Sequence, residues 1–102
     1  MAELEDHDRV AILTLESILD LKATAPLTEQ LLAHRGTDIV VDASAVERLG
    51  AQSLQVLLSA LATWQADGHQ LQFRQPSDAF VESLQLFGVD AEPFLKHPHL
   101  TN

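Results

Sequence analysis

Two histidines near the C-terminus, His97 and His99, are the pair whose type and spacing come nearest to a metal site. Imidazole binds zinc, but a structural or catalytic zinc site needs three or four ligands, and the chain contains no cysteine to supply the rest. A polar tail is therefore the better interpretation, and we expect no metal site. The remaining histidines, at positions 7, 34 and 69, fall at the ends of predicted elements and are expected to be solvated.

Asp42 is a second candidate, because it follows the apolar run DIVV at the position where α/β sheets place their sites. Alternatively, its side chain forms hydrogen bonds within the following loop, and the sequence does not decide between these roles. The next junction, residues 48–54, reads RLGAQSL and offers only Ser53, without a base or carboxylate beside it. The chain also has no GxxxxGK[ST], GxGxxG or HExxH motif. We therefore predict no catalytic residue, no cofactor and no enzyme activity.

The composition describes one small acidic domain. The 102 residues include 6 Lys and Arg against 15 Asp and Glu, a net charge of −9. Too few basic residues are present to build a nucleic-acid site or to bind an anionic membrane surface. The start MAELEDHD has no apolar core, so we expect no secretion signal and a cytoplasmic protein. We expect a single domain over residues 1–102, with an acidic lead-in at 1–8 and an irregular C-terminal tail at 90–102.

Apolar periodicity predicts alternating strands and helices. Strands are expected at residues 9–15, 16–21, 38–42 and 69–75, and helices at 24–36, 51–68 and 78–88. Thr24 is expected to cap the first helix, and Gly36 to end it. The order β-β-α-β-α-β-α predicts an α/β sandwich in which a mixed sheet of four to five strands carries helices mainly on one side.

The helix expected at 51–68 carries no charged residue from Gly50 to Ala66, although 21% of the chain is charged. Its inward stripe is predicted to be Leu54, Leu57, Leu58 and Leu61, which recur at helical spacing. The opposite face presents Gln52, Gln55, Ser59, Ala62, Thr63 and Ala66, with Val56, Ala60 and Trp64 on a flank. An uncharged outer face of this kind is typical of a protein–protein interface. Trp64 itself is either part of that interface or packed in the core under the C-terminal tail.

The region from residue 38 to residue 58 resembles the STAS domain family, which includes bacterial anti-sigma-factor antagonists and the cytoplasmic domains of sulfate transporters. The family pattern is an apolar strand ending in Asp, then roughly L-S-G-V-x-x-x-D-S-S-G-L-x-x-L, and VVDASAVERLGAQSLQVLL aligns with it without a gap. The matching positions are Asp42, Ser44, Val46, Leu49 and Leu54. LTLESILDLKATAPLTEQL is similar to the family's N-terminal L-x-G-x-L-D-x-x-x-A-x-x-L, and FVESLQLFGVD resembles its closing helix.

The resemblance implies a docking surface without the family's covalent switch. In the phospho-regulated members, the D-S-S-G segment carries the serine that a partner kinase phosphorylates. Here those positions are Gly50, Ala51, Gln52 and Ser53, and the acceptor position, Gln52, has no hydroxyl. The residues predicted to bind a partner are Arg48, Gly50, Ala51, Gln52, Ser53, Gln55, Val56 and Ser59.

The resemblance leaves several functions open. The first is a phosphorylation-independent STAS adaptor that binds a histidine kinase of a chemotaxis or two-component pathway, or an anti-sigma-type kinase. The second is the STAS subunit of a lipid-transporting ABC importer, packed on its ATPase. The third is a switchable anti-sigma-factor antagonist that uses Ser53, Ser44 or Ser59. An enzyme is the fourth, and the absence of site chemistry makes it the weakest.

Overall fold

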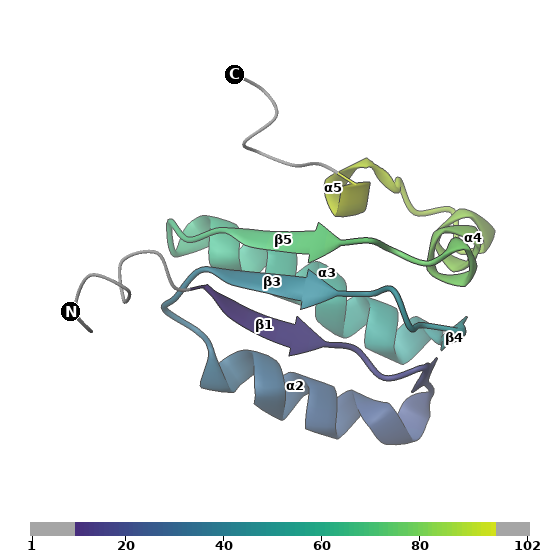
Figure 1. Ribbon diagram of the computed structural model, residues 1–102, viewed down its shortest axis with the longest axis horizontal. Coiled ribbons are helices and arrows are strands. Elements are labelled where there is room, and N and C mark those ends of the chain that lie inside the picture. The colour runs from purple at the N-terminus through teal and green to yellow at the C-terminus, as the bar shows by residue number, and fades with distance from the viewer. Residues whose placement is uncertain (1–9, 96–102) are drawn as a thin grey trace.

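The structure, a computed structural model, describes residues 10–95 (Figure 1). The predicted acidic lead-in at residues 1–8 and the histidine pair at 97 and 99 lie outside these residues. The strands are β1 (Ala11–Thr14), β2 (Ile18–Leu19), β3 (Ile39–Asp42), β4 (Arg48–Leu49) and β5 (Leu71–Arg74). The helices are the 3-10 turn η1 (Leu21–Ala23), α2 (Thr24–Ala33), α3 (Ala51–Ala66), α4 (Asp78–Leu86) and α5 (Glu92–Leu95).

The α/β class is confirmed, but the strands are arranged differently from the mixed sheet that we predicted. The five described strands form a three-stranded sheet, β1-β3-β5, and a separate two-stranded sheet, β2-β4. Every pair is parallel. In the main sheet, each connection between neighbouring strands contains a helix, which returns the chain to the same edge before the next strand begins. After β1 ends at Thr14, β2 leaves the main sheet and pairs with β4.

The main sheet is covered on one face, as predicted for helices packed mainly on one side. Residues that share this face by register, Leu13, Val41 and Phe73, are buried. On the other face, Ile12 and Arg74 are exposed. Figure 1 shows α3 crossing behind the three strands and α2 running along the β1 edge.

Helix α3 is rotated relative to the predicted inward stripe. Leu54 and Leu57 are buried as expected, but Leu58 and Leu61 are only half-buried. The other buried positions are Ser53, Ala60 and Trp64. The rotation follows from α2, which packs beside α3 and covers the flank that we had left open to solvent.

The described part of the tail that we predicted to be irregular, residues 90–95, contains a short helix. Residues Glu92–Leu95 form α5, and Phe94 is fully buried. Its ring centroid lies 4.7 Å from that of Phe73 and 5.6 Å from that of Phe80, both in edge-to-face geometry. These contacts hold α5 against β5 and α4 by aromatic packing.

Helix α2 begins differently from the prediction. The side chain of Asp20, rather than Thr24, provides the cap, and it accepts from the backbone N–H groups of Lys22 and Ala23 at the start of η1. Thr24 is already helical and continues η1 into α2. Gly36 lies beyond the end of α2 with a φ of 93°, a conformation that favours glycine.

Candidate partner-binding site

The junction between β4 and α3 is built around a close approach at Gly50. The Gly50 N–H donates to the carbonyl oxygen of Leu19 at 2.9 Å. A Cβ at position 50 would lie 3.2 Å from that same oxygen, tighter than ordinary contacts. Gly50 therefore lets the junction pack against its own chain at β2. Gly50 was predicted as a partner-binding residue, and this internal contact is a sufficient reason for the glycine.

Strand β2 brings a second segment to this junction. Ile18 and Arg48 are register partners of the parallel β2-β4 pair, so their side chains lie on the same side of the small sheet. Both are exposed, and Leu21 in η1 has 69% of its surface exposed. The sequence did not identify Ile18 and Leu21 as surface residues, because the run ESILDL was interpreted as a continued strand. The Asp20 cap was the available signal that a new helical segment begins there.

The exposed face of α3 continues this surface. Ala51, Gln52, Gln55 and Ser59 are exposed, as predicted, and Val56 is half-buried. Their neighbours along the face, Ala62, Gln65 and Ala66, are also exposed. The face is uncharged from end to end, and the nearest charged residues along the chain are Arg48 before it and Asp67 after it.

Ser53 does not belong to this surface. We predicted it as a partner-binding residue, but it is fully buried. Its Oγ lies 3.4 Å from Thr24 Oγ1 and 3.4 Å from the carbonyl oxygen of Asp20. One helical step from Gln52 turns a side chain by about 100°, and here that step carries it from solvent into the α2–α3 contact. In this conformation a kinase has no access to the hydroxyl of Ser53.

Asp42 forms hydrogen bonds within the following loop, which is the structural one of the two roles considered for it. One carboxylate oxygen accepts the N–H of Ser44 at 2.9 Å, and the other accepts from Arg74, its register partner on β5, at 3.3 Å. The bond from Ser44 is the main cause that lowers the pKa of Asp42. Hydrogen bonds to the charged form favour it, so the carboxylate is a stable anion that fixes the loop after β3.

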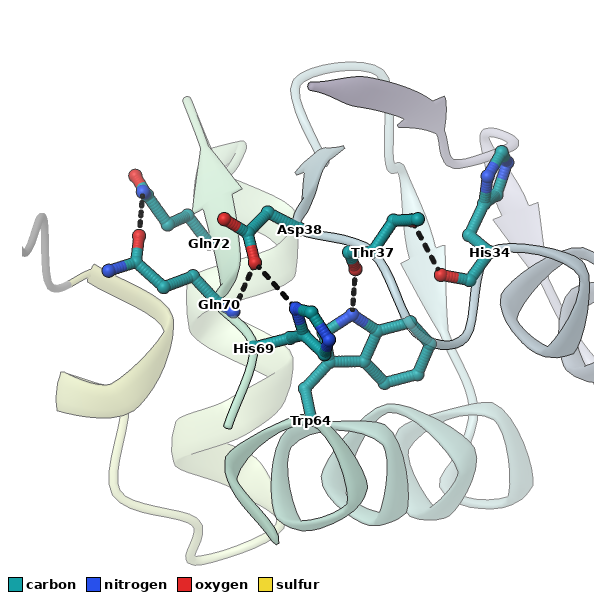
Figure 2. A network of polar contacts seen from close by, with 7 residues as sticks. All are labelled: His34, Thr37, Asp38, Trp64, His69, Gln70 and Gln72. Carbon is teal, nitrogen blue, oxygen red and sulfur yellow. Dashed lines mark hydrogen bonds and ion pairs between the residues drawn. The ribbon is translucent and has the colours of Figure 1, made fainter. Parts of the chain in front are cut away.

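A polar network lies at the opposite end of α3 (Figure 2). The Trp64 side chain is buried and donates to the carbonyl oxygen of Thr37 at 2.7 Å. The Asp38 carboxylate accepts from the Gln70 N–H at 2.9 Å and lies 3.2 Å from Nδ1 of His69. His69, which we expected to be solvated, is thus half-buried and paired. This network connects α3 to the starts of β3 and β5.

Trp64 is a core residue, but it does not pack as we proposed for the core alternative. We expected the C-terminal tail to cover it, whereas its indole is bonded to the loop between α2 and β3. The uncharged surface of α3 therefore does not include Trp64.

Among residues 10–95, no group of three or more His, Cys, Asp or Glu side chains could hold a metal ion. Among the same residues, no helix is long and apolar enough to span a membrane.

The parallel three-stranded sheet with its crossover helices, and the exposed junction before α3, are the features of a STAS-type domain. The comparisons with known proteins agree: the sequence model of the family described as "Mlab, STAS domain" matches residues 2–97. The chain is also similar to the anti-sigma-F factor antagonist RsfB in two strains of Mycobacterium tuberculosis. The identity is 37% over 90 residues, which covers 83% of this chain and 71% of each relative. The chain belongs to the STAS domain family, as the resemblance predicted.

Proposed function

We propose that this protein is a non-enzymatic interaction module of bacterial cytoplasmic signalling, and that it binds a protein partner without being phosphorylated. The binding site is the surface formed by Arg48, Ala51, Gln52, Gln55 and Ser59, here called the α3 surface. The similarity to proteins named as anti-sigma-F factor antagonists supports an anti-sigma pathway, and we propose an anti-sigma-type kinase as the partner.

The observation that carries this proposal is the uncharged exposed face of α3. A solvated helix ordinarily places Glu and Lys on its outer side, yet α3 has none over 16 residues in a chain of net charge −9. Charged residues are depleted at the centre of protein interfaces, because they lose their hydration there without gaining a partner. Arg48, the cation that precedes α3 in the chain, is suited to orienting a partner more than to increasing affinity.

Two observations support binding without phosphorylation. Gln52 stands at the acceptor position implied by the family pattern and has no hydroxyl. The adjacent hydroxyl, on Ser53, is buried against Thr24. Gln52 then acts as a fixed neutral hydrogen-bonding group, so that partner binding is independent of kinase activity.

The proposal is tested by placing a charge in the α3 surface. Gln52→Asp and Ser59→Lys each put an unpaired charge into the centre of the interface, so we expect the dissociation constant for the captured partner to rise at least about tenfold. An acidic residue in the first turn favours a helix, so Gln52→Asp is expected to leave the fold intact. Affinity is measured by surface plasmon resonance with the partner first captured from extract and identified by mass spectrometry.

Gln30 provides the matched control, because it is an exposed glutamine on α2. Gln30→Asp and Gln30→Lys introduce the same charges away from the α3 surface and should leave the partner bound. If both α3 variants bind as tightly as the unmodified protein, the interface lies elsewhere. If the partner is identified as a histidine kinase, or as the ATPase of an ABC importer, the α3 surface remains the proposed binding site. The anti-sigma-type kinase is then no longer the proposed partner.

A further inference from the structure

Ser53 places a buried hydroxyl in the first turn of α3. Among residues 10–95, Ser53 is the one polar or charged residue with a buried side chain, and it is 0% exposed. Its Oγ, the Oγ1 of Thr24 and the carbonyl oxygen of Asp20 form a triangle with sides of 3.4, 3.4 and 3.5 Å. Two hydroxyl protons are available for these three oxygens, so the carbonyl and one hydroxyl can both be satisfied as acceptors.

The triangle joins two segments that lie far apart in the sequence. Asp20 belongs to the turn that starts η1, where its carboxylate accepts the N–H groups of Lys22 and Ala23. Ser53 belongs to the first turn of α3. The bond from the Gly50 N–H to the Leu19 carbonyl joins the same two segments one turn earlier. The start of α3 is therefore fixed to the start of η1 and α2 at two successive points.

We propose that Ser53 and Thr24 are positioning residues, whose hydroxyl pair holds the first turn of α3 in the orientation that binds the partner. This inference rests on the proposed function of the α3 surface. Because Ser53 faces inward, Gln52 is turned outward by the same helical step. The same pair fixes η1, which carries the exposed Leu21 next to the junction. The hydroxyl pair thereby fixes the position of the exposed Leu21 on η1 relative to the exposed Gln52 on α3.

The energetics favour positioning over stability as the role of the pair. Oxygen separations of 3.4 to 3.5 Å are long for O–H···O bonds, so each bond is weak. Replacing both members of such a pair by apolar groups of the same shape is often nearly neutral for stability. A satisfied buried polar network, however, specifies one arrangement of the elements that it joins. Loss of the pair should therefore affect local order and binding more than global unfolding.

The test uses Ser53→Ala, Thr24→Val, their double variant, and Thr24→Ser as the conservative control that keeps the hydroxyl. We expect Ser53→Ala and Thr24→Val each to raise the dissociation constant for the captured partner about three- to tenfold, mainly through faster dissociation. The double variant should resemble either single variant, because either change alone breaks the pair. Thr24→Ser should bind as the unmodified protein does.

A second readout separates positioning from general destabilisation. Amide hydrogen exchange in the unbound protein should become at least about threefold faster at Gly50, Leu54 and Ala23, whose N–H groups are hydrogen-bonded at the two helix starts, with unchanged exchange at Val41 in the middle of the sheet. Because either single variant breaks the same pair, Thr24→Val tests the proposal even if Ser53→Ala fails to fold.

The outcomes distinguish the two proposals. If both single variants bind and exchange as the unmodified protein does, while Gln52→Asp loses the partner, the positioning role is wrong and the α3 surface stands. Faster exchange throughout the sheet would show a merely structural role and also overturn the positioning proposal. If Gln52→Asp and Ser59→Lys both keep the partner, both proposals fall together.

Discussion

Trp64 and Thr37 are joined by a hydrogen bond of 2.7 Å, from the indole N–H at the last turns of α3 to the backbone carbonyl of the loop that enters β3 (Figure 2). At the other end of α3, Ser53 contacts Thr24 at the start of α2. The two contacts show that α2 and α3 lie side by side and run in the same direction. Both ends of α3 are therefore fixed to the same neighbouring segment.

The first prediction concerns that bond. Trp64→Phe keeps an aromatic ring in the core but removes the donor, which leaves the Thr37 carbonyl without this partner. We expect a loss of about 1–3 kcal/mol in the free energy of unfolding. Urea denaturation followed by far-UV circular dichroism measures it, since the variant lacks the chain's single tryptophan. Leu32→Ala, on the exposed side of α2, is the control and should change stability by less than about 0.5 kcal/mol. Equal stability of Trp64→Phe and the unmodified protein would contradict the role given to the bond.

The second prediction concerns the rotation of α3. Leu57 is 0% exposed, so Leu57→Ala should cost about 2–5 kcal/mol. Leu61 is only half-buried, so Leu61→Ala should cost clearly less than Leu57→Ala, although the sequence placed both in one stripe. Urea denaturation followed by Trp64 fluorescence compares the two, with Gln55→Ala as the surface control. A larger loss for Leu61→Ala than for Leu57→Ala would restore the orientation that we first predicted.

The third prediction concerns acid sensitivity. Hydrogen bonds from the Gln70 N–H to Asp38, and from the Ser44 N–H to Asp42, are the main causes that hold the pKa of each carboxyl below its ordinary value of 3.8. A lowered pKa in the folded state means that folding favours the ionised form. This stabilisation is present above pH 3.8 and is lost as the pH falls through the folded-state pKa. The free energy of unfolding, measured in urea at pH 7, 5 and 3, should therefore decline below about pH 5.

Asp38→Asn separates this contribution from the general effect of acid. The variant should be less stable than the unmodified protein at pH 7, where the Asp38 carboxylate is ionised. The difference should shrink towards pH 3 as Asp38 takes up its proton and its side chain becomes neutral like that of Asn. A difference that stays constant from pH 7 to pH 3 would contradict the role of the Asp38 charge.

The sequence predicted the elements that are set by local patterns. The strand Ile39–Asp42 and the helix Ala51–Ala66 lie where their β-branched run and helical periodicity placed them. The uncharged outer face of α3 was also readable, because it depends only on which residues occupy one side of a helix. The STAS family followed from the spacing of several weak motifs taken together.

Features that depend on contacts between distant segments were not predictable in the same way. Ser53 was assigned to the surface because a serine in an uncharged helix gives no sign of whether another helix will cover it. Ala60 was placed on the flank of the outer face for the same reason, and Trp64 was left between interface and core. The strand β2 separates from β1 because it pairs with β4, about 30 positions later, and no local pattern encodes that pairing. Likewise, the sequence pattern of Glu92–Leu95 indicated irregular structure, whereas the aromatic contacts of Phe94 with distant residues hold this segment as α5.

The last prediction concerns the covalent switch. Incubation with ATP and a captured anti-sigma-type kinase, followed by intact-mass measurement, should show no stoichiometric phosphate on this protein. Gln52 offers no hydroxyl, and that of Ser53 lies in the α2–α3 contact, where an added phosphate would require the helix to open. A single phosphate mapped to Ser53, with a change in partner binding, would contradict this and favour a switchable antagonist.

Gln52→Ser is the informative control, because it places a hydroxyl at an exposed position of the first turn of α3 and leaves the packing of Ser53 untouched. A dianionic phosphate at a helix N-terminus is favoured by the helix dipole, so the phosphorylated form is expected to fold. If the kinase phosphorylates Gln52→Ser but not the unmodified protein, the side chain at position 52 alone prevents phosphorylation. The phosphorylated variant should then lose the partner as Gln52→Asp does, because both place negative charge at the same point of an interface whose neutrality permits binding.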